Sequence, residues 1–195
     1  ACDVFVTETT FGLPIYQWPD PDSVAVEILQ WWQGNAAQGR ASVLFCYALG
    51  KAQRILALLA RLTPQMVYLH DAMSAPVKLY RAAGIEMLPT AVVSQMPRVT
   101  TFGDALILAP PGARGTPWMR RFAPYATGFA SGWMLDAEHC RLRGYDRGFA
   151  LSDHADWNGL LRSVRETGAR RVLATHGQAD ALLAQLRSEN IEAHA

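Results

Sequence analysis

The stretch "RASVLFCYALG", residues 40–50, runs directly into "KAQRILALLARL", residues 51–62, and this pair predicts the architecture of the chain. The first segment is almost continuously apolar, which is typical of a strand buried on both faces. Gly50 interrupts that run. Apolar residues then recur at the spacing of an amphipathic helix, at Ile55, Leu58, Leu59 and Leu62. We therefore expect a parallel, Rossmann-like layer in which strands and helices alternate.

The same alternation extends along most of the chain. Periodicity and turn residues predict strands over 3–8, 65–70, 105–109, 129–133, 147–151, 170–177 and 191–195. They predict helices over 24–35, with Ser23 as its cap, and over 75–84, 156–168 and 178–190. Proline and glycine crowd residues 110–117, which predicts an irregular loop there.

Composition limits the class of protein. The 195 residues are enough for one large domain or two small ones, and half of them are apolar, so we expect an ordered globular fold. A net charge of +1 gives no overall positive field for nucleic acid, so any such contact is a local patch. The three cysteines are far apart without a CxxC pair, which favours a reducing, cytoplasmic location. No apolar run is long enough to cross a membrane, and no signal peptide is predicted.

Three ionisable residues stand at the ends of predicted strands or at strand–helix junctions. Glu8 ends the first strand, His154 lies in "LSDHADW" (151–157), and His176 lies in "VLATHGQ" (172–178). Strand ends converge on a crevice in α/β folds, so the three residues indicate a shared site. Taken singly, each also suits an ordinary capping or loop role. A carboxylate such as Glu8 orients an imidazole for proton transfer, and a neutral imidazole is a good zinc ligand.

A second candidate site combines positive charge with an aromatic ring. The segment "PPGARGTPWMRR" (110–121) holds Arg114, Arg120 and Arg121 around Trp118. Arginine pairs with phosphate and an aromatic ring stacks on a base, so this loop is a candidate nucleic-acid contact. Lys51, which opens a predicted helix after a strand, is a weaker candidate for binding phosphate. The alternative is a solvated basic loop with a tryptophan in the core.

Four motifs together resemble the β-CASP branch of the metallo-β-lactamase superfamily. These are "VFVTETTFG" (4–12), "LFCYALGKAQRILALL" (44–59), "LSDHADW" and "VLATHGQ", in the order that the family has them. The resemblance is to ligase-associated DNA exonucleases and to nucleases similar to messenger-RNA 3′-end processing factors. It implies a zinc-dependent nuclease that hydrolyses phosphodiester bonds of DNA or RNA with two zinc ions. The family's HxHxDH block has no counterpart here, so the chain resembles only the C-terminal part of such an enzyme.

The resemblance also implies an organisation and a set of roles. Residues 1–12 would be the last strand of a lactamase part, 13–150 a β-CASP domain, and 151–195 the closing part of the lactamase αββα fold. His154 and Glu8 would be catalytic, His154 as general acid and Glu8 as its support. His176 would be the last metal ligand. Two departures from the family pattern are Asp153 and Gln178.

Several expectations about ligands and partners follow from the resemblance. The chain alone would not retain zinc and would show no nuclease activity. Its partners would be DNA or RNA and DNA ligase-associated repair proteins, with no membrane contact. Exposed strand edges and apolar surface would lead either to a homo-oligomer or to poor order in residues 1–12 and 151–195. The competing hypothesis is a non-catalytic α/β module that binds nucleic acid or protein. A Rossmann-like domain for an unrelated ligand is less favoured, because no GxGxxG follows a strand.

Overall fold

The computed structural model describes residues 2–195 and divides the chain into two compact units. The continuous unit runs from Pro19 to Leu151. The discontinuous unit combines the residues up to Trp18 with Ser152–Ala195. The division therefore falls after residues 18 and 151, whereas the sequence motifs predicted it after residues 12 and 150. The naming of these parts as β-CASP and lactamase segments stays a prediction.

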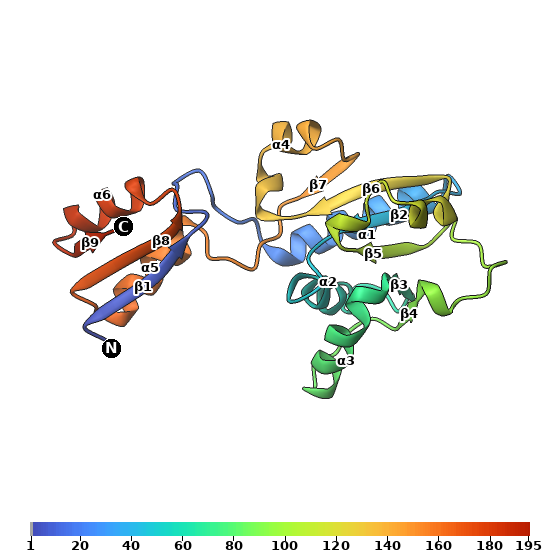
Figure 1. Cartoon of the computed structure of the whole chain (residues 1–195), viewed down its shortest axis with the longest axis horizontal. Coiled ribbons are helices and arrows are strands. Elements are labelled where there is room, and N and C mark those ends of the chain that lie inside the picture. The colour runs from blue at the N-terminus through green and yellow to red at the C-terminus, as the bar shows by residue number, and fades with distance from the viewer. Residues whose placement is uncertain (1) are drawn as a thin grey trace. The chain divides into compact units, whose positions relative to one another are not determined.

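The continuous unit contains a six-stranded parallel sheet (Figure 1). Its strand order is β4-β3-β5-β2-β6-β7. The strands are β2 (Ala41–Phe45), β3 (Val67–Leu69), β4 (Thr90–Val92), β5 (Leu106–Ala109), β6 (Tyr125–Ala130) and β7 (Arg147–Phe149). β2 lies between β5 and β6, and all five of its residues are buried, as its largely apolar sequence predicts.

Helices and single turns connect these strands. The α-helices are α1 (Pro21–Ala36), α2 (Lys51–Ala60), α3 (Ser74–Ala82) and α4 (Ala137–Leu142). The 3₁₀ turns are η1 (Asp71–Met73), η2 (Val93–Gln95), η3 (Pro111–Ala113), η4 (Pro117–Phe122) and η5 (Gly132–Leu135). The sequence patterns did not predict β4 or α4, although they did predict β3, β7 and β9, which have only three residues each.

A separate apolar core covers each face of this sheet. On one face Leu44 and Leu106 pack with residues of α1, α2 and α3. On the other face Val43 and Ile107 pack with Phe102, with η4 and with the α4 region. Adjacent strand residues such as Val43 and Leu44 thus belong to different cores, because side chains alternate across a strand. Both faces of this sheet are consequently shielded from water.

The beginning of α1 corrects one prediction. The helix starts at Pro21 and not at Val24, and its cap is Asp20, whose side chain accepts a hydrogen bond from the Asp22 amide. Ser23, the predicted cap, lies inside the first turn and donates its hydroxyl to the Asp20 carbonyl. The physical reason is that proline fits the first helical position and aspartate fits the position before it.

The discontinuous unit contains a second parallel sheet, of three strands in the order β1-β8-β9. β1 (Val4–Thr9) pairs with β8 (Arg171–Gly177), and β8 pairs with β9 (Glu192–His194). Figure 1 shows β1 and β8 side by side although they are far apart in the sequence. The helices α5 (Trp157–Thr167) and α6 (Asp180–Ser188) complete a small core with β8.

The expected fold class is confirmed in both units, since each has a parallel sheet with interleaved helices. Within residues 2–195, the structure contains no helix with the length and apolar character needed to traverse a lipid bilayer.

Candidate functional site

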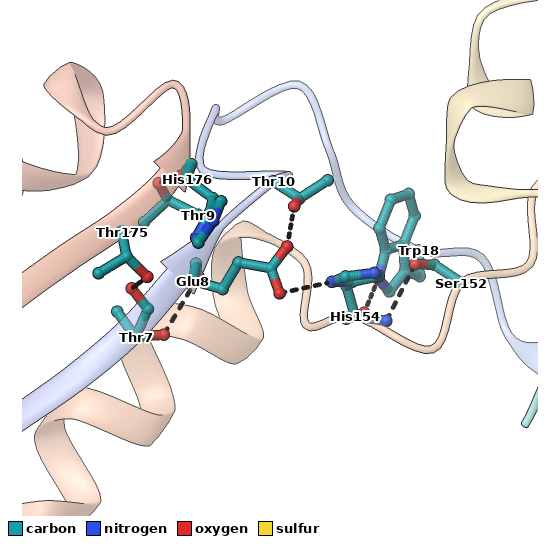
Figure 2. Close-up of polar contacts among 9 residues, drawn as sticks. All are labelled: Thr7, Glu8, Thr9, Thr10, Trp18, Ser152, His154, Thr175 and His176. Carbon is teal, nitrogen blue, oxygen red and sulfur yellow. Dashed lines mark hydrogen bonds and ion pairs between the residues drawn. The ribbon is translucent and has the colours of Figure 1, made fainter.

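Glu8 and His176 lie at the same edge of the β1–β8–β9 sheet, where β1 and β8 both end. The strands are parallel, with Glu8 beside Thr175 and Thr9 beside Gly177. His176 is therefore the extra residue of a bulge between these two pairs. The close-up in Figure 2 shows His176 next to Thr9 and close to the start of the Glu8 side chain. The carboxyl ends of parallel strands thus bring together two residues that are 168 positions apart in the sequence.

The bulge depends on backbone conformations that most residues avoid. His176 has a φ of 55° and Gly177 a φ of 76°, so two consecutive residues are left-handed. The hydroxyl of the fully buried Thr9 donates a hydrogen bond to the His176 carbonyl. A Cβ at position 177 would lie only 2.3 Å from the Thr9 carbonyl oxygen. Glycine is therefore required there, both for its φ and for the close approach of the β1 backbone.

The side chains of Glu8 and His154 lie within ion-pair distance of each other, as Figure 2 shows. The distance between His154 Nδ1 and Glu8 Oε2 is 3.4 Å, and 46% of each side chain is exposed. The other carboxylate oxygen of Glu8 accepts a hydrogen bond from the Thr10 hydroxyl. Glu8 is thus held from both sides. The carboxylate in turn fixes the orientation of the imidazole and favours the Nδ1–H tautomer.

The loop that carries His154 is anchored to the segment after β1. The indole of Trp18 donates a hydrogen bond of 2.9 Å to the His154 carbonyl, and the His154 amide donates to the Ser152 hydroxyl at 3.1 Å (Figure 2). The ring of Phe11 contacts both the Trp18 and His154 rings edge-on, with centroid distances of 4.8 and 5.8 Å. Asp156 caps α5 through the Gly159 amide and also accepts from the Trp18 amide. These contacts fix the backbone that carries His154.

The site offers an exposed acid–imidazole pair, with a second imidazole on the neighbouring bulge. The His154 side chain is 46% exposed, and an imidazole can exchange a proton or donate a hydrogen bond to an anion. Throughout residues 2–195, no group of three or more His, Cys, Asp or Glu side chains is arranged to hold a metal. The metal-ligand role of His176 therefore stays a prediction.

Two of the three arginines predicted to contact nucleic acid hold the protein's own backbone. Arg114 donates to the Arg143 carbonyl at 2.6 Å and to the Gly144 carbonyl, and its guanidinium lies 4.3 Å from the centre of the Tyr145 ring. Arg121 donates to three carbonyls at 2.7 to 2.9 Å, those of Val93, Met96 and Pro97. These bonds tie the irregular loop to neighbouring segments.

The remaining residues of that loop divide between surface and core. Arg120 is exposed. Trp118 packs against the second core of the sheet and contacts the rings of His70 and Phe122. The tryptophan thus packs against the core, as the alternative expected, and the contact of the three arginines with nucleic acid stays a prediction. A charge pattern in the sequence does not indicate whether a guanidinium faces solvent or a backbone carbonyl.

Lys51, which was predicted as a weak candidate for binding phosphate, is buried and does not lie on the surface. The residue is 3% exposed, and its ammonium group lies 5.9 Å from the centre of the Tyr47 ring. The first amide groups of α2 are already engaged, since Lys51 donates to the Leu49 carbonyl and Ala52 to the Tyr47 carbonyl. The helix start therefore has fewer free donors than the sequence pattern suggested.

Sequence reasoning missed the residues that build the support of the site. Thr10, Trp18 and Asp156 each make a bond that positions Glu8, His154 or their loop. The role of Asp156 could have been predicted, because aspartate immediately before an amphipathic helix is a typical cap. No sequence pattern indicated the role of Trp18, since the His154 carbonyl to which it donates is 136 residues away.

Comparison with known proteins identifies a relative that matches almost the whole chain. The chain is 32% identical over 193 residues to a protein from Opitutus terrae named Probable DNA ligase. The match covers 99% of this chain but only 18% of the relative. No model of a known protein family matches the chain.

These findings correct the functional expectation. The relative is named for DNA ligase, which is not a zinc-dependent nuclease, and residues 2–195 hold no metal-binding group of three or more ligands. The interpretation as part of a zinc-dependent DNA or RNA nuclease, including an exonuclease or a messenger-RNA processing factor, is therefore wrong. The interpretation came from the resemblance of short motifs at strand ends. Such motifs indicate local structure more directly than they indicate a reaction.

Proposed function

We propose that this chain is a DNA-contacting α/β module and that the Glu8–His154 site meets a phosphate of the DNA backbone. The observation that carries the proposal is the alignment of 193 residues with a protein named Probable DNA ligase. We further propose that the partner is DNA and not RNA, and that the module works alongside proteins that join or repair DNA.

The geometry of the site supports a phosphate contact. His154 is held by its own backbone contacts and by Glu8, so little conformational freedom is lost when its exposed edge meets a ligand. A protonated imidazole donates a charge-assisted hydrogen bond to a phosphate oxygen, and such bonds are about twice as strong as neutral ones. One Glu8 carboxylate oxygen accepts a hydrogen bond from Thr10 and the other lies 3.4 Å from His154 Nδ1, so the carboxylate is held in place and orients the ring.

DNA binding by fluorescence anisotropy tests the proposal. The probes are a labelled nicked duplex, an intact duplex of the same sequence and the corresponding RNA duplex. Affinity is measured between about 50 and 200 mM salt, because phosphate contacts make binding fall steeply with salt. We expect His154→Gln to weaken DNA binding several-fold and to reduce the salt slope by about one, the effect of losing one phosphate contact.

His139→Gln is the matched control. His139 is also a partly exposed histidine beside an aspartate, with Nδ1 3.5 Å from Asp136 Oδ2 and 42% of its side chain exposed, but it belongs to the continuous unit. Its replacement should leave DNA affinity unchanged. Equal affinities of wild type and His154→Gln at every salt concentration would remove the Glu8–His154 site from the proposal. Absence of binding to any DNA probe would overturn the proposed function itself.

A further inference from the structure

A cavity of about 390 Å³ lies between α3 and β4, the edge strand of the six-stranded sheet. Besides these two elements, β3 and the η2 region contribute residues to its wall. Its size is within the range of small-molecule sites in proteins. All of its lining residues belong to the continuous unit. We call it the α3–β4 cavity.

The α3–β4 cavity combines an apolar part with a positively charged part. Leu69 and Val77, each 1% exposed, supply apolar surface. Lys78 and Arg81 are exposed, and their spacing of three residues places them on one face of α3. Two cations on one face of a helix repel each other, so an anion bound between them would remove an unfavourable interaction.

The residues of the cavity do not neutralise this charge themselves. Among the described residues that line the cavity, none is acidic. Asp71, which follows β3, accepts a hydrogen bond from the Ser94 hydroxyl and is not part of the lining. Lys78 forms no ion pair and no side-chain hydrogen bond within residues 2–195. Its ammonium group is therefore available to a ligand.

Arg81 is already held in position. Its guanidinium donates to the Thr90 hydroxyl at 3.0 Å and to the Leu88 carbonyl. A guanidinium has five N–H groups, so further donors remain for a ligand. The Thr90 hydroxyl, which also lines the cavity, accepts the bond from Arg81 and can donate its own hydrogen. Because the arginine is fixed before a ligand arrives, little conformational freedom is lost on binding.

We propose that the α3–β4 cavity binds a small organic phosphomonoester. Such a group carries about 1.5 to 2 negative charges at neutral pH, which matches the two cations. Guanidinium and ammonium groups both form charge-assisted hydrogen bonds with phosphate oxygens. The apolar surface of Leu69 and Val77 suits the organic part of the ligand. This site goes beyond the proposed DNA contact in the discontinuous unit and does not depend on it.

Amide chemical shifts measured by NMR during a titration with glycerol phosphate test the site. Saturable shifts are expected over residues 74–81 and 90–96, and glycerol alone should not produce them. Lys78→Gln should weaken binding about ten-fold, the effect of losing one charge-assisted hydrogen bond. Lys78→Arg keeps the charge and should retain most of the affinity. Lys78 is exposed and makes no side-chain bond, so far-UV circular dichroism should show both variants folded.

Arg98→Gln is the matched control for charge. Arg98 is exposed, belongs to the continuous unit and does not line the cavity. Its replacement removes one positive charge, as Lys78→Gln does, and should leave the affinity for glycerol phosphate unchanged. His154→Gln should also leave it unchanged while weakening DNA binding, so the two proposals fail separately.

Two short oligonucleotides of the same sequence, with and without a terminal phosphate, distinguish the sources of the group. Binding that requires the terminal phosphate, is tighter than that of glycerol phosphate and is weakened by Lys78→Gln would assign the cavity to the end of a DNA strand. Equal or tighter binding of glycerol phosphate would assign it to a free phosphomonoester.

Three results would overturn the proposal. The first is the absence of saturable shifts with both glycerol phosphate and the phosphorylated oligonucleotide. The second is a set of shifts that glycerol alone reproduces. The third is equal weakening by Lys78→Gln and Arg98→Gln, which would reduce the effect to overall charge.

Discussion

The replacement Gly177→Ala tests the bulge that places His176 beside the end of β1. A Cβ at this position would lie 2.3 Å from the Thr9 carbonyl oxygen, 2.6 Å from the Thr9 carbonyl carbon and 2.8 Å from Thr10 Cα. All three are backbone atoms, so the clash cannot be relieved by a side-chain rotation. The end of β1 must move away from β8, and the hydrogen bond from the Thr9 hydroxyl to the His176 carbonyl is then lost.

The expected cost has two parts. A non-glycine residue with a left-handed backbone costs about 1–2 kcal/mol. Leaving the buried Thr9 hydroxyl without its partner costs about 1–3 kcal/mol more. Gly168→Ala is the matched control, since Gly168 lies in the same unit with a φ of 66° and has nothing within 4 Å of its Cβ position. That variant should therefore show only the first part of the cost.

Urea unfolding and amide hydrogen exchange over residues 171–177 provide the measurement. We expect Gly177→Ala to lower the free energy of unfolding by about 1–3 kcal/mol more than Gly168→Ala does, and to speed exchange along β8. Equal destabilisation of the two variants, within about 0.5 kcal/mol, would refute the claim that the close approach to β1 requires glycine.

Three further predictions concern single contacts. Trp18→Phe keeps the aromatic ring but removes the donor to the His154 carbonyl, so it should cost about 1 kcal/mol and broaden the His154 ring resonances in an NMR spectrum. Arg121→Met leaves three carbonyls without their donor and should lower the free energy of unfolding by about 2–4 kcal/mol in a urea titration. The Arg165 guanidinium lowers the pKa of Glu189 from 4.5 to about 2, so this carboxylate stabilises the fold above pH 4.5, and that contribution is lost as the pH falls through about 2. Glu189→Gln should therefore flatten the decline of the thermal midpoint over that pH range.

The architecture could be predicted because the residue patterns of strands and helices are local in the sequence. The largely apolar run of residues 41–45, followed by an amphipathic helix, predicted a strand buried on both faces next to a covering helix. The same reasoning identified β8, α5 and α6 from their own periodicity. β4 and α4 were missed, whereas β3, β7 and β9, which are as short as β4, were predicted from their sequences.

Side-chain environments were harder to predict. The sequence pattern predicted Arg114, Arg121 and Lys51 as surface cations. Arg114 is exposed but bonds to backbone carbonyls, Arg121 also bonds to carbonyls, and Lys51 is buried. The sequence does not distinguish a cation that contacts solvent or phosphate from one that bonds to a carbonyl 28 residues away. Only the folded chain decides among these partners.

The order of residues along the chain was enough to specify a parallel α/β structure, and it put Glu8, His154 and His176 at the ends of local elements. That these ends meet is a property of the folded molecule, because β1 pairs with a strand more than 160 residues away. The fold also makes Val4, Val6 and Leu173 face outward together. Periodicity along a chain specifies which side of a strand is apolar, whereas the neighbour that covers that side is set by packing between distant segments.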